Sequence, residues 1–303
     1  MHARRYLRLY LRLFAVLNAV SNPVGLAILV ASCVAALATS AHAEEKPLWE
    51  AGAGVGALVL PDYRGSDESR AYLLPFPYLI YRGQFLKADR EGVRAEFIDS
   101  DRVKLEVAVN ASQPVRSSSD RARSGMPDLK GSFEVGPSLS INLARSTDRK
   151  QRLDFRVPVS TGVTLGGGFQ GIGWQASPRL NLDLEDAGEG VIGAAGWNLG
   201  LVAGPIFQNR KRNAYFYDVP DRYARAGRPA YRSSGGYAGT QFIAALSRRY
   251  DRVWVGGFVR ADTLAGATFE NSPLVRRKSY VAAGIGVAYV FGKSERMVEV
   301  ADR

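Results

Sequence analysis

The sequence predicts an all-β protein, a transmembrane antiparallel β-barrel of about 12 strands that follows a cleaved signal peptide. Three observations support this fold class. The N-terminus has the parts of a secretory signal. Long segments after it alternate apolar and polar residues, which is typical of strands with two different faces. After residue 43 no apolar run reaches 18 residues, so helical membrane spans are excluded from the mature chain.

Residues 1–43 are the predicted signal peptide. Four arginines stand in the first 12 residues, an apolar run extends from Leu13 to Ala38, and Ala41-His42-Ala43 fits an A-x-A cleavage site. One alternative is an uncleaved transmembrane helix, because the run is long enough to span. Another is a lipoprotein site at Cys33. Pro23 interrupts the run, and the residues after Cys33 are apolar where a lipoprotein has a polar tether. We therefore predict cleavage after Ala43.

The predicted barrel occupies residues 44–291, and residues 292–303 form a charged C-terminal tail. The clearest strands are 11 to 15 residues long, whereas globular strands usually have about 5–6 residues. A tilted strand needs about 9–11 residues to cross a bilayer. The predicted strands are 49–60, 71–82, 84–89, 91–98, 102–112, 131–145, 151–165, 171–185, 190–204, 236–250, 252–265 and 277–291.

The alternation also assigns the two faces of the barrel. A soluble barrel would be apolar inside, and periodicity alone does not exclude it, but strand length, strand number and aromatic residues at strand ends favour the membrane version. Arg or Lys facing lipid at mid-membrane costs about 2–4 kcal/mol, so the charged face should line the lumen. The candidate lumen charges are Arg152, Asp154, Arg156 and Arg179. The face that includes Leu153, Phe155, Ile172, Trp174 and Leu182 is expected to be the lipid face.

Connection lengths predict which end of the barrel faces outward. Bacterial barrels have short periplasmic turns and long outer loops. The long connections 113–130, 205–235 and 266–276 then fall outside, together with the turn between the first two strands. The connection 205–235 interleaves arginines with tyrosines. Such a pattern can bind nucleic acid or a phosphorylated glycan. On an outer surface we expect lipopolysaccharide and outer-membrane lipid as partners and no nucleic acid, while a merely solvated loop remains an alternative.

The composition of the mature chain limits its chemistry. The only histidines are His2 and His42 and the only cysteine is Cys33, so all three leave with the signal peptide. Removal of the four leader arginines from the 40 Lys and Arg leaves 36 against 29 acidic residues, a formal charge of +7. A Ser-His-Asp site, a cysteine nucleophile and most zinc sites are excluded. We therefore predict no catalytic, cofactor-binding or metal-binding residues and no enzymatic activity.

Two sequence patterns nevertheless suggest chemistry. Acid pairs could serve a glycosidase mechanism; the candidates are Asp62 with Asp67 or Glu68, and Asp89 with Glu91. Acid pairs are common in polar turns, which is the alternative interpretation. Residues 166–171 match the glycine pattern G-x-G-x-x-G. A dinucleotide site requires a helix after these glycines, whereas here period-two alternation continues. We interpret residues 166–171 as a hairpin loop.

Several short motifs resemble the MipA/OmpV family of outer-membrane proteins of Gram-negative bacteria. They are Leu60-Pro61-Asp62-Tyr63-Arg64-Gly65-Ser66, Leu74-Pro75-Phe76-Pro77-Tyr78, Ala88-Asp89-Arg90-Glu91-Gly92-Val93-Arg94 and Gly125-Met126-Pro127-Asp128-Leu129. The resemblance covers the mature chain and is most specific in its N-terminal half. It implies a barrel in the cell outer membrane and transfers no catalytic residues.

The resemblance also implies a function. Family members are described as scaffolds that link a lytic transglycosylase to a murein polymerase, so we expect a non-enzymatic scaffold for murein (peptidoglycan) remodelling enzymes. A small porin-like channel, or a surface adhesin or stress-response barrel, is the alternative. The candidate interaction loop is Asp62, Tyr63, Arg64, Gly65 and Ser66.

Overall fold

The structure is a computed structural model that describes residues 44–83, 86–89, 92–100, 102–166, 168–187 and 195–300. The predicted signal peptide lies outside the described residues. The barrel belongs to one compact unit of the chain, Ala43–Arg145 together with Lys150–Arg303. In the described ranges, no helix is both long and apolar enough to cross a membrane.

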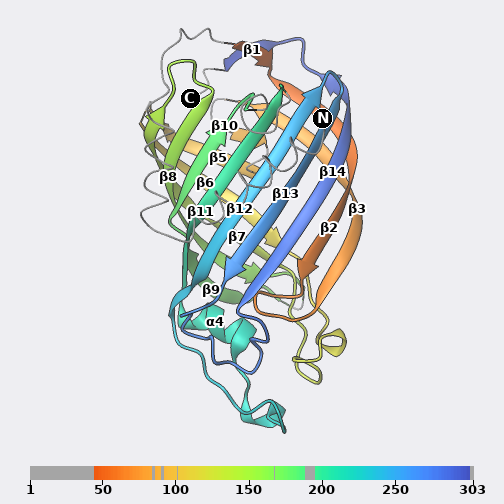
Figure 1. Cartoon of the computed structure of the whole chain (residues 1–303), viewed down its shortest axis with the longest axis vertical. Coiled ribbons are helices and arrows are strands. Elements are labelled where there is room, and N and C mark those ends of the chain that lie inside the picture. Colours follow the sequence, from red (N-terminus) through yellow and green to blue (C-terminus); the bar gives the residue numbers. More distant parts are fainter. Residues whose placement is uncertain are drawn as a thin grey trace, which may run out of the picture. The chain divides into compact units, whose positions relative to one another are not determined.

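A single antiparallel sheet of 13 strands closes into a barrel within the described residues (Figure 1). Its strands are β2 (Trp49–Pro61), β3 (Ser69–Arg82), β4 (Leu86–Asp89), β5 (Gly92–Asp99), β6 (Val103–Ser112), β7 (Ser132–Arg145), β8 (Gln151–Thr164), β9 (Gly171–Ala176), β10 (Arg179–Leu184), β11 (Trp197–Gln208), β12 (Gly236–Tyr250), β13 (Val253–Thr263) and β14 (Ser279–Lys293). β9 and β10 both pair with β8 and with β11. They are two parts of one interrupted strand, so the ring has 12 strands and the predicted fold class is confirmed.

The exterior of the barrel is apolar and its interior is polar. On β14, Val281, Ile285 and Phe291 are exposed, whereas Ala282 and Ala288 between them are buried. β7 shows the same alternation, with exposed Phe133 and Leu139 beside buried Ser138 and Ser140. Buried acidic and basic side chains lie on the inward face. This orientation is that of a membrane barrel and the inverse of a soluble one.

Glycines on the inward face of β2 allow close packing. A Cβ added to Gly54 would lie 2.5 Å from the backbone oxygen of Val287 and 2.6 Å from Cζ of Phe76. Phe76 points inward beside Trp254, with ring centroids 6.4 Å apart, and Tyr78 lies 6.0 Å from the same indole. One side of the lumen is therefore lined by glycines and aromatic rings.

The two ends of the barrel differ. The long connections 62–68, 113–131, 209–235 and 264–278 share one end, the lower end in Figure 1, as the sequence predicts. They include η1 (Ser117–Ser119), α4 (Arg210–Tyr217) and η2 (Asp221–Tyr223). At the other end, β1 (Glu44–Pro47) pairs antiparallel with β15 (Met297–Val300). That the long-loop end faces the cell exterior stays a prediction from the general architecture of bacterial barrels.

Prolines stand at two of the places where the strands differ from the prediction. β11 begins later than the predicted segment 190–204 and continues past Pro205, and the strand accommodates this residue at a register shift between Pro205 and Phe207. Proline has no N–H to donate, which is why it is found at bulges and strand edges. Pro178, likewise, stands in the break between β9 and β10. Residues 188–194 lie outside the described ranges.

The prediction that Ile172 and Trp174 share a face is wrong. Ile172 is 2% exposed, whereas Trp174 is 46% exposed. Between them Gly173 has a φ of +103°, and the pairing of β8 with β9 shifts register next to it, between Gly162 and Val163. The bulge disrupts the alternation, so Ile172 packs inward against the inner wall. At the chain end, β14 continues to Lys293, so the predicted tail 292–303 begins inside a strand.

Candidate functional site

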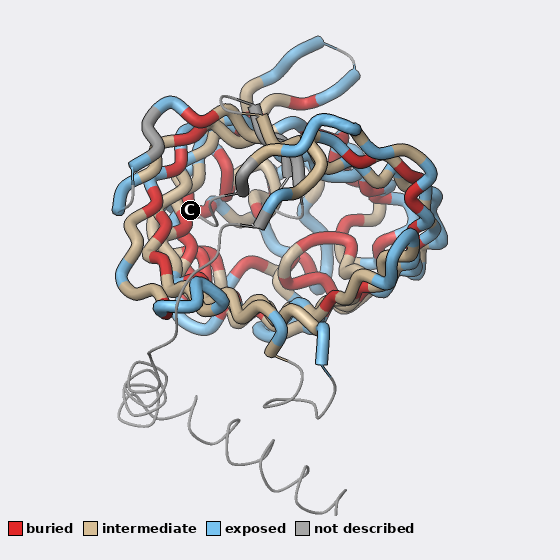
Figure 2. Tube along the Cα trace, turned by 90° about the horizontal axis from the view of Figure 1, so that it is seen from above, coloured by how far each residue is buried: buried red, intermediate tan, exposed pale blue. Residues whose placement is uncertain are grey.

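The long connections at one end fold together into a cap, which we define as residues 62–68, 113–131, 209–235 and 264–278. Their apolar side chains form a common buried core. Leu264, Phe269 and Leu274 are fully buried, and Phe269 stacks on Tyr217 with ring centroids 3.8 Å apart and an interplanar angle of 9°. Viewed along the barrel, buried segments lie within the ring of strands (Figure 2). The cap is thus a folded element with its own core.

The candidate interaction loop lies at the centre of this cap. The Tyr63 hydroxyl donates to the Leu274 carbonyl at 2.8 Å, and burial raises the pKa of Tyr63. The hydroxyl of Tyr217 donates to the Arg64 carbonyl at 2.9 Å. Gly65 has a φ of +96°, which favours glycine, and its carbonyl accepts from two backbone N–H groups of the connection 264–278. The loop therefore joins other cap segments and does not project as a free surface loop.

Ser66 links the loop to the connection 113–131. Its hydroxyl donates to Asp120 at 2.8 Å and accepts from the Glu68 N–H at 3.1 Å. Asp120 also accepts from the backbone N–H of Arg123 at 2.9 Å. Burial raises the pKa of the Asp120 carboxyl, although these hydrogen bonds act in the opposite direction. The raised pKa follows from withdrawing a carboxylate from water where no described Lys or Arg forms an ion pair with it.

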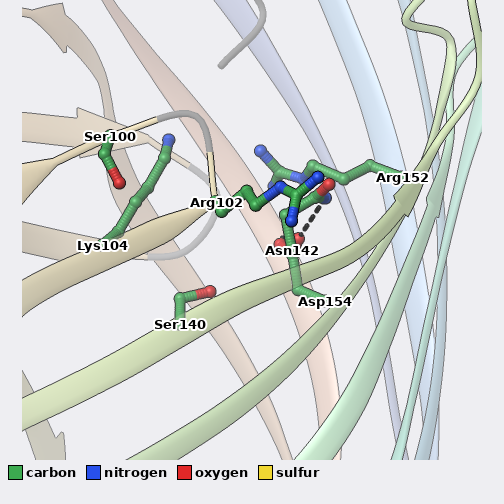
Figure 3. Close-up of a pocket in the computed structure, with 7 residues that line it drawn as sticks. All are labelled: Ser100, Arg102, Lys104, Ser140, Asn142, Arg152 and Asp154. Carbon is green, nitrogen blue, oxygen red and sulfur yellow. Dashed lines mark hydrogen bonds and ion pairs between the residues drawn. The ribbon is translucent and has the colours of Figure 1, made fainter.

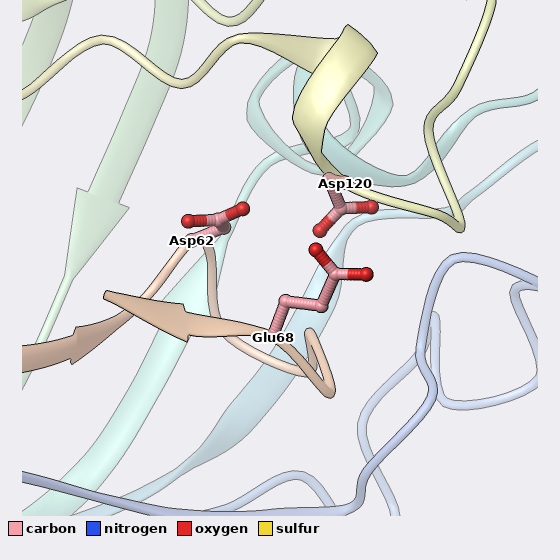
Figure 4. Close-up of side chains that lie close together, drawn as sticks. All are labelled: Asp62, Glu68 and Asp120. Carbon is pink, nitrogen blue, oxygen red and sulfur yellow. The ribbon is translucent and has the colours of Figure 1, made fainter.

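Asp62, Glu68 and Asp120 bring carboxylate oxygens within 4.8 Å of one another (Figure 4). Oxygen ligands of this kind suit hard cations such as Ca²⁺. Two of the three, however, already have cationic partners. Asp62 accepts two hydrogen bonds from Arg70, at 2.6 and 2.9 Å. Glu68 pairs with Arg121 at 2.8 Å. Asp62 and Glu68 therefore belong to ion pairs of the cap, and Asp120 is held by hydrogen bonds from Ser66 and Arg123.

The acid pairs considered from the sequence have different outcomes. Asp67, like Glu68, pairs with Arg121, at 3.2 Å. Each of the three carboxylates in the stretch 62–68 is therefore held by an arginine, which is the usual state of a polar turn. Glu91 and the side chain of Asp89 lie outside what the structure describes. The predicted hairpin loop at 166–171 joins β8 to β9, so a strand follows these glycines.

The candidate lumen charges form a second cluster. Asp154 is paired with Arg152 and with Arg156, each at 3.1 Å, and accepts from Asn142 Nδ2 at 2.9 Å. Arg152 also pairs with Asp183 of β10 at 3.3 Å. Arg179 stands opposite Arg156 in the pairing of β10 with β8. The structure thus brings all four candidates onto two neighbouring strands.

A small pocket opens beside this cluster, toward the end that carries the short turns. Arg102, Arg152, Asn142 and Asp154 converge on it (Figure 3). Its lining is Ser100, Arg102, Lys104, Ser140, Asn142, Arg152 and Asp154. Four strands or their ends contribute, from β5 to β8, so the pocket is polar and rich in basic side chains.

Sequence reasoning missed another inward cluster at the same end. Glu50 lies between Arg82 at 2.8 Å and Arg249 at 3.0 Å, and Arg249 also donates to the Tyr78 hydroxyl at 3.1 Å. Arg82 further donates to the carbonyl of Pro47 at 2.7 Å, so the cluster ties β1 to the barrel. The period-two alternation of β2 could have predicted that Glu50 points inward, because Glu50 lies on the same face of the strand as the glycines.

Comparison with known proteins gives one family. A protein-family model described as "MltA-interacting protein MipA" matches residues 53–291. No curated protein matches the chain. Among solved structures, a bacterial polysaccharide outer membrane secretin is 7% identical, with 80% of this chain and 99% of that chain covered and a TM-score of 0.41. The outer membrane protein OprG from Pseudomonas aeruginosa is 10% identical, with 81% of this chain and 94% of that chain covered and a TM-score of 0.20. The Ralstonia pickettii toluene transporter TbuX is 10% identical (82% and 70% covered, TM-score 0.22).

Proposed function

The chain belongs to the MipA family and is an outer-membrane β-barrel protein, and we propose from this premise that it is a non-enzymatic scaffold for murein-remodelling enzymes. The observation that carries the proposal is the family match over residues 53–291, whose description names a partner, MltA. We propose that a lytic transglycosylase docks on this barrel and that a murein polymerase is held beside it.

The division of the barrel into two ends supports a docking position. In bacterial barrels the short turns face the periplasm, where murein enzymes act. In this chain that end carries the paired strands β1 and β15 and the basic pocket of Figure 3. The side chains of Tyr63 and Ser66 in the loop Asp62–Ser66, in contrast, form hydrogen bonds with other segments of the cap. We therefore propose docking at the short-turn end and assign the interaction loop a structural role in the cap.

The test is capture of a purified lytic transglycosylase by the full chain in detergent, with and without a purified murein polymerase. We expect a stable complex and no glycan turnover by the barrel alone. Arg102→Glu, at the pocket rim, should weaken capture, because reversing an exposed interface charge lowers the association rate. Arg222→Glu, an exposed arginine of the cap, is the matched control. Failure of the wild-type chain to capture the enzyme would overturn the docking proposal.

A second candidate function is a narrow anion-favouring channel. The observation in its favour is the inward set Arg152, Arg156 and Arg179 on β8 and β10. The folded cap across the other end restricts such a path to small solutes. We expect conductance steps in planar bilayers, with anion preference reduced in Arg152→Gln. A bilayer that shows no steps with correctly folded protein would remove this candidate.

Lipopolysaccharide is the partner we propose for the cap's outer surface. Exposed cations stand there in three of the four cap segments, among them Arg116, Arg121, Arg222, Arg232, Arg276 and Arg277. Arginine forks bind phosphate bidentately, and lipopolysaccharide presents phosphates at this depth of the membrane. Comparison of Arg276→Gln/Arg277→Gln with wild type in lipopolysaccharide binding tests this partner, and equal binding would count against it.

A further inference from the structure

Beneath the cap, two arginines reach the inner wall of the barrel with donor groups that have no described partner. Arg64 comes from the candidate interaction loop and Arg212 from the first turn of α4. Nη1 and Nη2 of Arg64, and Nε and Nη1 of Arg212, are buried without a hydrogen-bond partner among the described residues. Arg212 as a whole is 5% exposed. Buried donors that stay unsatisfied are costly, so this geometry requires an explanation.

The remaining contacts of Arg64 fix its position. Its Nε donates to Asp262 at 2.9 Å, and the same carboxylate accepts from Arg260 at 2.7 and 2.9 Å and from the Tyr280 hydroxyl at 2.7 Å. Asp262 therefore has no capacity left for the Nη groups. A Cβ on Gly239 would lie 2.9 Å from Arg64 Nη2, so this end of the guanidinium lies close to the backbone of β12.

Arg212 is held in a similar way on another part of the wall. Its Nη2 bonds the Glu134 carboxylate on β7. A Cβ on Gly162 of β8 would lie 3.1 Å from Arg212 Nη1. Both guanidinium groups act on the buried Tyr217 hydroxyl: burial raises the pKa of Tyr217 to about 12, and the charges of Arg64 and Arg212 oppose that rise. The two arginines thus flank one residue of the cap core.

The charge balance at this level is positive. Arg64 and Arg260 share the single carboxylate of Asp262, whereas Arg212 pairs with Glu134. One positive charge therefore remains beside Asp262, next to buried donor atoms of Arg64 that have no described partner. A bound oxyanion would neutralise this charge and accept the four open donors, because guanidinium forks match carboxylate and phosphate geometry.

We propose that Arg64 and Arg212 form an oxyanion-binding site between the cap and the lumen, which takes a small solute bearing a phosphate or carboxylate group. The site is independent of docking at the short-turn end, and it would act as a selective position at the outer end of the lumen. The competing outcome is water, which would bridge Arg212 to the partnerless carbonyl oxygens of Gln208 and Asn213.

The test is calorimetric titration of the full chain in detergent with inorganic phosphate and with acetate, at constant ionic strength set with chloride. We expect saturable binding in wild type. Arg64→Lys and Arg212→Lys retain the charge beside Asp262 and Glu134 but replace the planar guanidinium fork, so the open Nη and Nε positions are lost. Each should weaken binding about ten- to a hundredfold, the factor equivalent to one charge-assisted hydrogen bond. Arg222→Lys, exposed and stacked on Tyr223, is the matched control and should bind as wild type does.

Each result decides the proposal. A heat-modifiability gel first establishes that every variant is a folded barrel, and having two separate lysine variants guards against one that does not fold. Absence of saturable phosphate and acetate binding in wild type would overturn the site in favour of water. Unchanged affinity in both lysine variants would assign the anion to another surface. Displacement of phosphate by anionic phosphatidylglycerol vesicles would overturn the claim of a small free solute. Capture of the transglycosylase is a separate measurement, so failure of one proposal leaves the other intact.

Discussion

Phe269→Ala should open the cap and leave the barrel intact. Phe269 is fully buried and stacks on Tyr217, and it belongs to no strand of the sheet. Truncation of a buried phenylalanine costs about 3–5 kcal/mol. Each 1.4 kcal/mol is a factor of ten in an equilibrium constant, so the open fraction of the cap should rise roughly a hundred- to several-thousandfold.

The assay is tryptic cleavage after Arg123, mapped by mass spectrometry. Arg123 is 3% exposed in the closed cap, so cleavage there reports opening. When opening and closing are fast, the cleavage rate follows the open population. Phe169→Ala makes the same chemical change at a side chain that is 85% exposed, and should leave the rate unchanged. Equal cleavage in Phe269→Ala and Phe169→Ala would refute the packed cap, and loss of heat resistance in Phe269→Ala would refute its separation from the barrel.

Three further predictions concern single contacts. Gly52→Ala should lower the temperature at which the barrel unfolds on gels, because its Cβ would lie 2.3 Å from the Tyr289 backbone oxygen, whereas Gly200→Ala, whose Cβ would meet an atom at 3.4 Å, should be tolerated. Ser66→Ala removes a donor to a buried carboxylate, which costs about 1–3 kcal/mol, and should lower the cap's melting temperature by near-ultraviolet circular dichroism. Because the pKa of Asp120 is raised, the folded cap binds the proton of this carboxyl more tightly than the unfolded chain does. The stability that this adds is complete below the ordinary pKa of 3.8 and is lost as pH rises through the raised pKa. Asp120→Asn should therefore flatten the pH dependence of the cap's melting temperature.

The barrel could be predicted because its signal is local. Successive residues of β7 face the lipid and the lumen in turn. A few neighbouring residues are therefore enough to assign Phe133 to the outer face and Ser138 to the inner face. The exceptions have equally local causes that periodicity does not register. Gly173 takes a positive φ and moves Ile172 inward, and the strand bulges at Pro205 where the pattern indicated an end. Both exceptions are changes of backbone conformation, and the alternation of apolar and polar residues does not predict such changes.

The cap could not be predicted, because its contacts are between residues far apart in the chain. The Tyr63 hydroxyl bonds a carbonyl 211 positions away, and Arg64 bonds Asp262 across 198 positions. Neither connection carries a periodic pattern that would indicate its partner. The sequence could predict that the arginines of β8 and β10 share one face, since Arg152, Asp154 and Arg156 alternate, but not that Asp183 completes their pairing.

The stretch 60–70 joins the cap to the barrel, and this explains why its residue types resemble an active site. An isolated turn with two aspartates, a glutamate and two arginines offers acids and bases in close sequence. In the fold each group is committed: Asp62 to Arg70 at the strand ends, Tyr63 to the cap core, and Arg64 to Asp262 on the inner wall. The carboxylates of this stretch are in contact with arginines, whereas two N–H groups of the Arg64 guanidinium have no described acceptor. The chemistry left over at this junction is therefore the binding of an anion and not the transfer of a proton, which is why the test of Arg64 is a titration with phosphate.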